Sequence, residues 1–288
     1  MCRKLSCYLT AALALALLAG CGPAAAQPGS QTTPPTEQAT LEPTPEPTPE
    51  PTPEPTPEPT PEPTPEPAVY QFGVPVEESE PVADDSFFDN AVFLGDSRTE
   101  GLQLFSGLSH GTFYWARGMN VFRADDPEFK VIPIGGETYS VVDALKQRSF
   151  DLVYIMIGVN ELGYPVESYE TGLNNLIDHV LATQPDAVVY LQIMPPLNDA
   201  VCRANGLASY INNENLQKFN EVVQRVAAEK KVALLNTAEV YTGADGQLPA
   251  ELAGDGCHFT VDGYTRWADY MRSHVIDREL YFYSREQA

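Results

Sequence analysis

Five short apolar runs, separated by stretches with helical periodicity, constrain the fold of this chain more than any other feature. The runs cover residues 91–95, 130–134, 152–158, 187–193 and 232–236. They are almost continuously apolar and do not alternate with polar residues. This pattern predicts strands that are buried on both faces of a parallel sheet.

The stretches between the later runs carry the apolar stripes of amphipathic helices. The stripes recur at i, i+3, i+4 and i+7, which is the spacing of one helix face; they comprise Leu173, Leu176, Ile177, Val180 and Leu181, and then Leu216, Phe219, Val223, Val226 and Ala227. A last helix is expected from near Asp262 to beyond Met271. Strands alternating with helices predict one doubly wound, three-layer α/β domain with a parallel sheet of about five strands, in a flavodoxin-like arrangement.

The first residues have the form of a processing signal. Arg3 and Lys4 precede an apolar stretch, residues 9–18, that is too short to span a bilayer as a stable helix. The stretch ends in Leu-Ala-Gly-Cys21, which resembles the lipobox of bacterial lipoproteins. This resemblance implies cleavage after residue 20, acylation of Cys21 and anchoring on the extracellular face of the bacterial cell membrane. The alternative is an ordinary secretory signal and a secreted protein.

Residues 42–67 form a Pro-Thr-Pro-Glu repeat that has no apolar side chain to bury. Proline fixes φ and lacks an amide hydrogen, so the repeat cannot join a helix or a sheet. As polyproline II it would extend about 80 Å, at about 3.1 Å per residue. We therefore expect a signal peptide over residues 1–20, a disordered tether over 21–86 and one folded domain over 87–288.

Charge and cysteine content exclude several classes of function. The formal charge is −23, and residues 87–288, with 15 basic and 27 acidic residues, carry −12. Such a surface disfavours nucleic acid and direct adsorption to anionic lipid, which leaves the lipid anchor as the expected membrane contact. No Cys/His cluster has zinc spacing, so we expect no metal and no other cofactor. We also expect a monomer.

Polar residues with catalytic potential follow several of the apolar runs. Ser97 comes directly after the first run, Gly136 after the second and Asn160 after the third, while Asp255 and His258 lie beyond the fifth. Because the carboxyl ends of parallel strands meet at one edge of a sheet, these residues are expected to lie together there. A serine on a strand-to-helix turn is well placed as a nucleophile, and a nearby histidine oriented by an aspartate can serve as its base.

Each of these residues also has a structural interpretation. Taken alone, Ser97 is typical of a helix N-cap, Asn160 of a cap or turn, and His258 of a hydrogen-bonded structural histidine. Asp96, beside the serine, is expected to fix the turn through backbone amides. The catalytic interpretation rests on the whole set of residues falling at one edge.

In its motifs the chain resembles the SGNH (GDSL-type) hydrolase superfamily. The matching blocks occur in the family's order and cover the whole predicted domain: Gly95-Asp-Ser-Arg-Thr-Glu-Gly101, Gly136-Glu-Thr138, Gly158-Val-Asn160 and Asp255-Gly-Cys-His258. The resemblance implies a carboxylic ester hydrolase that needs no cofactor.

The resemblance also assigns roles to residues of the site. Ser97 is the expected nucleophile, His258 its base and Asp255 the residue that orients His258; the oxyanion donors are expected to be the amides of Ser97 and Gly136 and the side chain of Asn160. The expected substrate is a short acyl ester, such as an O-acetyl group on a glycan. The alternatives are an O-acyltransferase of the same fold and a non-catalytic glycan-binding surface protein.

Two positions depart from the family pattern, and two cysteines lie near the motifs. Arg98 stands where many members have leucine, and Glu161 stands where aspartate is usual. A structural salt bridge of Arg98 with Glu100 or Glu161 is the favoured interpretation, and contact with a polar substrate is the alternative. Cys202 and Cys257 fall at the same predicted edge, so a disulfide between them is a hypothesis.

Overall fold

The computed structural model describes residues 68–288; the predicted signal peptide, Cys21 and the proline-rich repeat lie outside this range. The strands are β1 (Ala91–Gly95), β2 (Thr112–Trp115), β3 (Ile132–Ile134), β4 (Glu137–Tyr139), β5 (Leu152–Met156), β6 (Val188–Gln192) and β7 (Ala233–Leu235). The α-helices are α1 (Ser97–Phe105), α2 (Val121–Ala124), α3 (Val141–Leu145), α4 (Val166–Thr183), α5 (Asp199–Ala204), α6 (Asn213–Glu229), α7 (Val261–Ser273) and α8 (Arg278–Gln287). Three 3-10 helices add η1 (Asp85–Phe88), η2 (Val159–Glu161) and η3 (Thr237–Val240).

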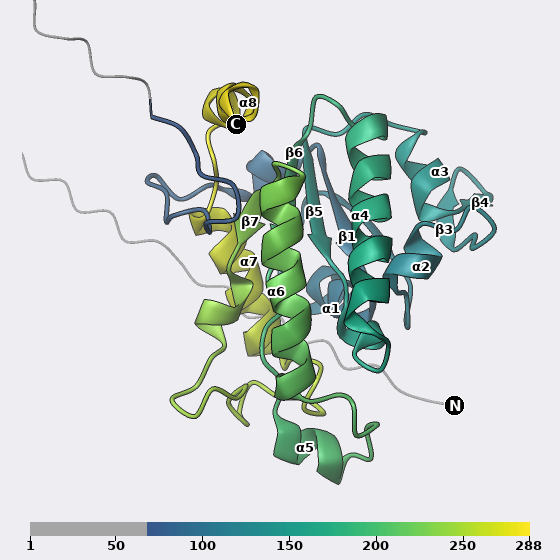
Figure 1. The fold of residues 1–288 in the computed structure, drawn as a ribbon, viewed down its shortest axis with the longest axis vertical. Helices are drawn as coiled ribbons and strands as arrows, with labels where there is room; N and C mark the ends of the chain where they lie inside the picture. The colour runs from purple at the N-terminus through teal and green to yellow at the C-terminus, as the bar shows by residue number, and fades with distance from the viewer. Residues whose placement is uncertain (1–67) are drawn as a thin grey trace, which may run out of the picture. The chain divides into compact units, whose positions relative to one another are not determined.

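Five of the strands form one parallel sheet with the order β2-β1-β5-β6-β7. Helices α4 and α6 lie side by side on one face of the sheet, and α1 and α7 pack together on the other (Figure 1). The predicted doubly wound, flavodoxin-like α/β fold is therefore confirmed. From β1 the chain adds β2 on one side of the sheet and then β5, β6 and β7 on the other, so the strand order reverses between β1 and β5. Ligands of such sheets bind at the carboxyl ends of the strands at that point.

One strand of the sheet was assigned wrongly from the sequence. The apolar run 130–134 contributes β3, which pairs only with β4 in an antiparallel hairpin outside the main sheet. The place beside β1 is taken by β2, which the apolar pattern did not reveal. The other four predicted strands and the helices with apolar stripes are confirmed as β1, β5, β6, β7, α4, α6 and α7.

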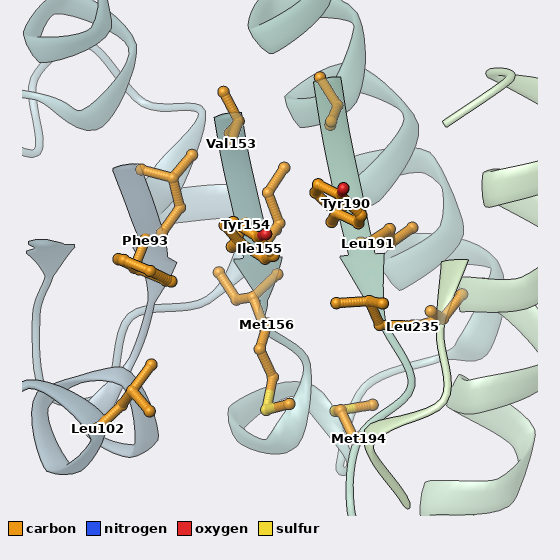
Figure 2. Packing of buried hydrophobic residues seen from close by; sticks show 14 of the residues in the cluster. Phe93, Leu102, Val153, Tyr154, Ile155, Met156, Tyr190, Leu191, Met194 and Leu235 are labelled. Carbon is orange, nitrogen blue, oxygen red and sulfur yellow. The ribbon is translucent and has the colours of Figure 1, made fainter. Parts of the chain in front are cut away.

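A ladder of stacked aromatic rings crosses the centre of the sheet. Phe113, Phe93, Tyr154 and Tyr190 are register partners on β2, β1, β5 and β6. Their ring centroids are 4.7, 5.1 and 4.5 Å apart in sequence across the strands, and each pair is stacked. Figure 2 shows Phe93, Tyr154 and Tyr190 at the level of the neighbouring aliphatic residues of the core. The ladder fixes the relative height of β1 and β5, whose ends carry the candidate site.

The folded domain begins earlier than the sequence predicts. The expected tether extends to residue 86, but Val76 is buried and its amide donates to the carbonyl of Leu234 on β7 at 2.8 Å. The amide of Tyr70 donates to Ser284 Oγ on α8 at 2.7 Å. The residues from Tyr70 to Val76 are therefore part of the domain. Within residues 68–288, no helix combines the length and apolar character needed to cross a bilayer.

Candidate active site

Ser97 lies on a tight turn between β1 and α1. It is the first residue of α1, and Asp96 caps that helix by accepting the amide of Arg98 at 2.8 Å. A Cβ at Gly95 would collide with Thr99 and with the carbonyl of Met156 on β5, so only glycine allows this close approach. The amide of Ser97 belongs to the first turn of the helix, where N–H groups have no partner inside the helix.

A continuous hydrogen-bonded chain joins the three residues predicted to be catalytic. Ser97 Oγ lies 2.8 Å from His258 Nε2, and His258 Nδ1 lies 2.8 Å from Asp255 Oδ2. Asp255 and His258 come from the loop before α7, whereas Ser97 comes from α1. The structure thus brings together residues that are about 160 positions apart in the sequence.

Asp255 is held as a carboxylate by its surroundings. Burial alone would raise its pKa, but the His258 ring and the backbone amides of His258 and Cys257 donate to it and hold the pKa well below its usual range. The two amides reach Oδ1 at 2.8 and 2.9 Å, which leaves Oδ2 for the ring. A carboxylate at Nδ1 keeps the proton on that nitrogen, so Nε2 is free to accept the hydroxyl proton of Ser97.

Asn160 lies on η2, directly after β5, and its side chain is held between two acceptors. Its Nδ2 donates to Asp96 Oδ2 at 3.1 Å and to the carbonyl of Met119 at 2.9 Å. A side-chain amide has two hydrogens, and both are engaged in this arrangement. Asn160 is therefore at the predicted edge of the sheet, but it must release one of these bonds before it can donate to an oxyanion.

Gly136 does not follow a strand of the main sheet, contrary to the premise of its predicted role. It forms, with Gly135, the exposed turn of the β3–β4 hairpin, which lies beside α3 (Figure 1). Its φ of +91° is a requirement of that turn. The loop after β2, residues 116–120, instead follows the strand that pairs with β1, and its Arg117 lines the same cavity as Ser97.

A cavity of about 450 Å³ opens beside Ser97 and His258. Its walls are mostly apolar and come from α1 and the start of α7, with Leu104, Phe105 and Tyr264 among them. Tyr264 can approach α1 because its ring lies against Gly101, where any Cβ would collide with it. The second glycine of the Gly95–Gly101 motif therefore shapes the cavity wall.

An ion pair that the sequence did not predict stands at the rim of this cavity. Arg117 donates through Nε and Nη2 to the two carboxylate oxygens of Glu100 at 2.6 and 2.7 Å. The Glu100 side chain is 11% exposed and that of Arg117 is 77% exposed. The hydrogen bonds and the charge of Arg117 lower the pKa of Glu100. Because Nη1 is not used in the pair, Arg117 has a donor left to offer a ligand.

The two residues that depart from the family pattern are both buried, and neither pairs with the other. Arg98 donates to backbone carbonyls and forms no salt bridge with Glu100 or Glu161, so that prediction is wrong. Glu161 accepts the amide of Val121 through Oε1 at 2.6 Å. Burial raises the pKa of Glu161 to about 8, and the nearby Asp96 carboxyl adds to the rise.

The hypothesised disulfide is not formed in the structure, in which Cys202 and Cys257 are both buried free thiols. The loop of Cys257 nevertheless packs on α5, since a Cβ at Gly256 would lie within 2.7 Å of Cys202 Sγ. Burial raises the pKa of Cys202 to about 11 and also raises that of Cys257. Protonated buried thiols are poor nucleophiles, so Ser97 is a better candidate nucleophile than either cysteine. Among residues 68–288, no three His, Cys, Asp or Glu side chains are grouped so as to hold a metal ion.

Comparison with known proteins finds one matching family and several similar proteins. The model of the GDSL-like lipase/acylhydrolase family matches residues 93–266. A protein of Acetivibrio thermocellus, provisionally named endoglucanase X, is 28% identical over 133 residues, which are 46% of this chain and 53% of that protein. The chain thus spans about half the length of this curated relative.

Solved structures share the fold. One from Streptococcus pneumoniae, provisionally described as a platelet activating factor, is 25% identical, with a TM-score of 0.51 over 64% of this chain and 82% of that chain. One from Parabacteroides merdae, provisionally described as a GDSL-like lipase, is 18% identical, with a TM-score of 0.50 over 64% of this chain and 94% of that chain. At this identity, the second shows the fold alone.

Proposed function

Because the chain belongs to the GDSL-like lipase/acylhydrolase family, whose members hydrolyse carboxylic esters, we propose that it is a serine esterase acting through Ser97, His258 and Asp255. The observation that carries the proposal is the hydrogen-bonded chain from Ser97 Oγ through the His258 ring to Asp255, with both bonds at 2.8 Å. This geometry supports the roles of nucleophile for Ser97, base for His258 and orienting acid for Asp255.

The first half of the reaction transfers the acyl group to the enzyme. His258 Nε2 takes the proton of Ser97 as Oγ attacks the ester carbonyl, and Asp255 stabilises the imidazolium that forms. When the tetrahedral intermediate collapses, the ester bond breaks and Nε2 gives its proton to the departing alcohol. The Ser97 amide, at the positive end of α1, is the first candidate donor to the oxyanion.

Water then completes the cycle. Its proton passes to His258 Nε2 while its oxygen attacks the acyl-serine carbonyl, and the proton returns to Ser97 Oγ as the acid leaves. We expect Asn160 to be a second oxyanion donor after one of its bonds, to Asp96 or to Met119, is released. The His258 and Asp255 side chains are each about 40% exposed, so water can reach them.

The proposed substrate is a short acyl ester, in particular an O-acetyl group on a glycan. Arg117 presents a free donor beside the apolar wall of the cavity, and this combination suits a sugar, which has hydroxyls and an apolar ring face. The provisional name of the Acetivibrio thermocellus relative, an endoglucanase, fits a polysaccharide substrate.

Hydrolysis of p-nitrophenyl acetate by residues 68–288 tests the esterase. Ser97→Ala should reduce kcat/KM by about 10³-fold or more, as expected when a triad nucleophile is lost. Ser106→Ala is the matched control, because it removes a buried hydroxyl from the other end of the same helix. Release that is equally fast in Ser97→Ala and wild type would refute the proposed nucleophile.

Acetylated polysaccharides then test the substrate class. Release of acetate from acetylated xylan or acetylated cell-wall glycan, lost in Ser97→Ala, supports the glycan ester. If acetate is released only when a sugar acceptor is present, and the acceptor becomes acetylated, the protein is an acyltransferase. If p-nitrophenyl acetate is cleaved but neither glycan is, these glycans are not its substrates.

We further propose that Cys21 carries the lipid that holds the protein on the outer face of the bacterial cell membrane. The proposal rests on the Leu-Ala-Gly-Cys21 motif and the proline-rich repeat that follows. Expression of the full chain in a bacterial host tests it by fractionation. Cys21→Ala should move the protein from the membrane fraction, whereas an unchanged distribution would contradict acylation of Cys21.

A further inference from the structure

Arg98, the residue after the proposed nucleophile, reaches away from solvent and into the loop that carries the proposed base. Its Nε donates to the carbonyl of Cys257 at 3.0 Å, and Cys257 immediately precedes His258. The side chain is 1% exposed although it carries a charge. Its guanidinium carbon also lies 5.2 Å from the centroid of the Phe259 ring, on the other side of His258. Arg98 therefore contacts both neighbours of His258.

The same guanidinium reaches a third loop at the carboxyl edge of the sheet. Its Nη1 donates to the carbonyl of Pro195, in the loop after β6, at 3.4 Å. The nucleophile turn, the histidine loop and the loop after β6 thus meet at one side chain. Lysine could not hold them in this way, because it has one nitrogen where arginine has three in a rigid plane.

No ion pair with Glu100 or Glu161 accounts for the burial of the Arg98 charge. Glu100 is taken by Arg117, and Glu161 accepts from Val121. The buried acid near Arg98 is Asp96, whose pKa is raised by burial and lowered in part by the Arg98 charge. Burying a guanidinium costs free energy, so its position needs a compensating role. Direct bonds to the backbone beside His258 suggest what that role is.

We propose that Arg98 is a positioning residue that holds the His258 loop against the nucleophile turn, so that Nε2 stays within hydrogen-bond distance of Ser97 Oγ. The His258–Asp255 bond lies within one loop, since the residues are three positions apart. The Ser97–His258 bond instead joins α1 to that loop, and Arg98 makes the adjacent cross-connection. The inference rests on the proposed function, because it assigns Arg98 a part in the same reaction.

Arg98→Met and Arg98→Lys test the proposal with p-nitrophenyl acetate. Methionine removes both bonds to the carbonyls, and a misplacement of about 1 Å in such a site can cost about 10²-fold in rate. We expect kcat of Arg98→Met to fall by about 10²-fold while KM changes by less than about 3-fold, because Arg98 is too buried to touch the ester. Arg98→Lys, which keeps one donor, should lie between wild type and Arg98→Met.

Arg278→Met is the control, because Arg278 is an exposed arginine that makes the same kinds of contact. Arg278 donates to the backbone carbonyls of Asp151 and Asp186 and lies 5.1 Å from the centroid of the Phe282 ring, far from the histidine loop. It should lose comparable contacts with no change in kcat. Thermal melting and near-ultraviolet circular dichroism of each variant establish that the fold is kept.

Three results would overturn the proposal. The first is a folded Arg98→Met with wild-type kcat, and the second is a loss seen only in KM, which would make Arg98 a substrate contact. The third applies if Arg98→Met does not fold, in which case Arg98→Lys is the test. An Arg98→Lys variant that has wild-type kcat, or that also fails to fold, would assign Arg98 to stability alone. If wild type itself shows no hydrolysis that depends on Ser97, the proposed function fails, which is a different result from wild-type activity that Arg98 variants retain.

Discussion

Replacing Glu161 by glutamine should make the protein less sensitive to alkaline pH. Glu161 is fully buried beside Asn160, with Oε1 accepting the amide of Val121 at 2.6 Å. Among the described residues, Oε2 has no hydrogen-bond partner. Glutamine keeps the acceptor and nearly the volume of the side chain and removes the ionisation, and the cost of burying its NH2 group is the same at every pH. The comparison therefore isolates what it costs to charge this group.

The magnitude follows from the pKa of about 8 in the folded protein against the ordinary 4.5. The folded state holds the proton more tightly than the unfolded chain. The stability that wild type gains from keeping Glu161 protonated is thus fully present below about pH 4.5 and is lost as the pH rises from there through 8. At about 1.4 kcal/mol per pH unit between the two pKa values, the loss from pH 5 to pH 9 is about 4 kcal/mol.

Urea denaturation of wild type and Glu161→Gln at pH 5, 6, 7, 8 and 9 measures this loss. The difference in unfolding free energy should grow in favour of Glu161→Gln by about 4 kcal/mol across the series. The exposed Glu167, replaced by glutamine, is the control and should give a curve parallel to wild type. A Glu161→Gln curve parallel to wild type would refute the reasoning, because it would mean that burial does not keep this carboxyl protonated.

Three further substitutions test the site. Asp255→Asn should lower kcat by about 10⁴-fold, because the amide no longer holds His258 in the tautomer that accepts from Ser97; a loss below 10-fold in steady-state hydrolysis would argue against this. Gly136→Ala should leave kcat within about 2-fold of wild type, since the hairpin turn lies outside the main sheet. The φ of +91° at this position should make alanine lower the unfolding free energy by about 1 kcal/mol. A large fall in kcat would restore the oxyanion role of Gly136. Gly101→Ala should cost about 1–3 kcal/mol in urea denaturation because the new Cβ collides with the Tyr264 ring, and an unchanged midpoint would show that the ring moves aside freely.

The fold could be predicted from the sequence wherever burial on both faces left a continuous apolar run. This holds for β1, β5, β6 and β7. β2 was missed although three of its four residues are aromatic, because it is a short edge strand that is only partly buried and its apolar run is shorter than the others. The run 130–134 was wrongly predicted to be a strand of the main sheet because of its apolar content. Pro133 has no amide hydrogen to donate to a neighbouring strand, which was a reason not to place the run in the centre of a sheet.

The site divides in the same way. Ser97, Asp255 and His258 follow from motif and position, because their geometry is set locally by a strand end and by a short loop. Gly136 was misplaced because its assignment depended on the misread strand. The Glu100–Arg117 pair and the contacts of Arg98 depend on how β2 and the histidine loop fold over α1, and no local pattern in the sequence encodes that.

The chain enters the domain on the side opposite the candidate site. Tyr70 binds α8 through Ser284, and the start of α8 reaches the carbonyls of Asp151 and Asp186, which stand just before β5 and β6. Entry is thus at the amino ends of the strands, whereas Ser97 lies at their carboxyl ends. The incoming chain therefore leaves the cavity beside Ser97 uncovered, and an attachment made at that side of the domain would not block a substrate from reaching it.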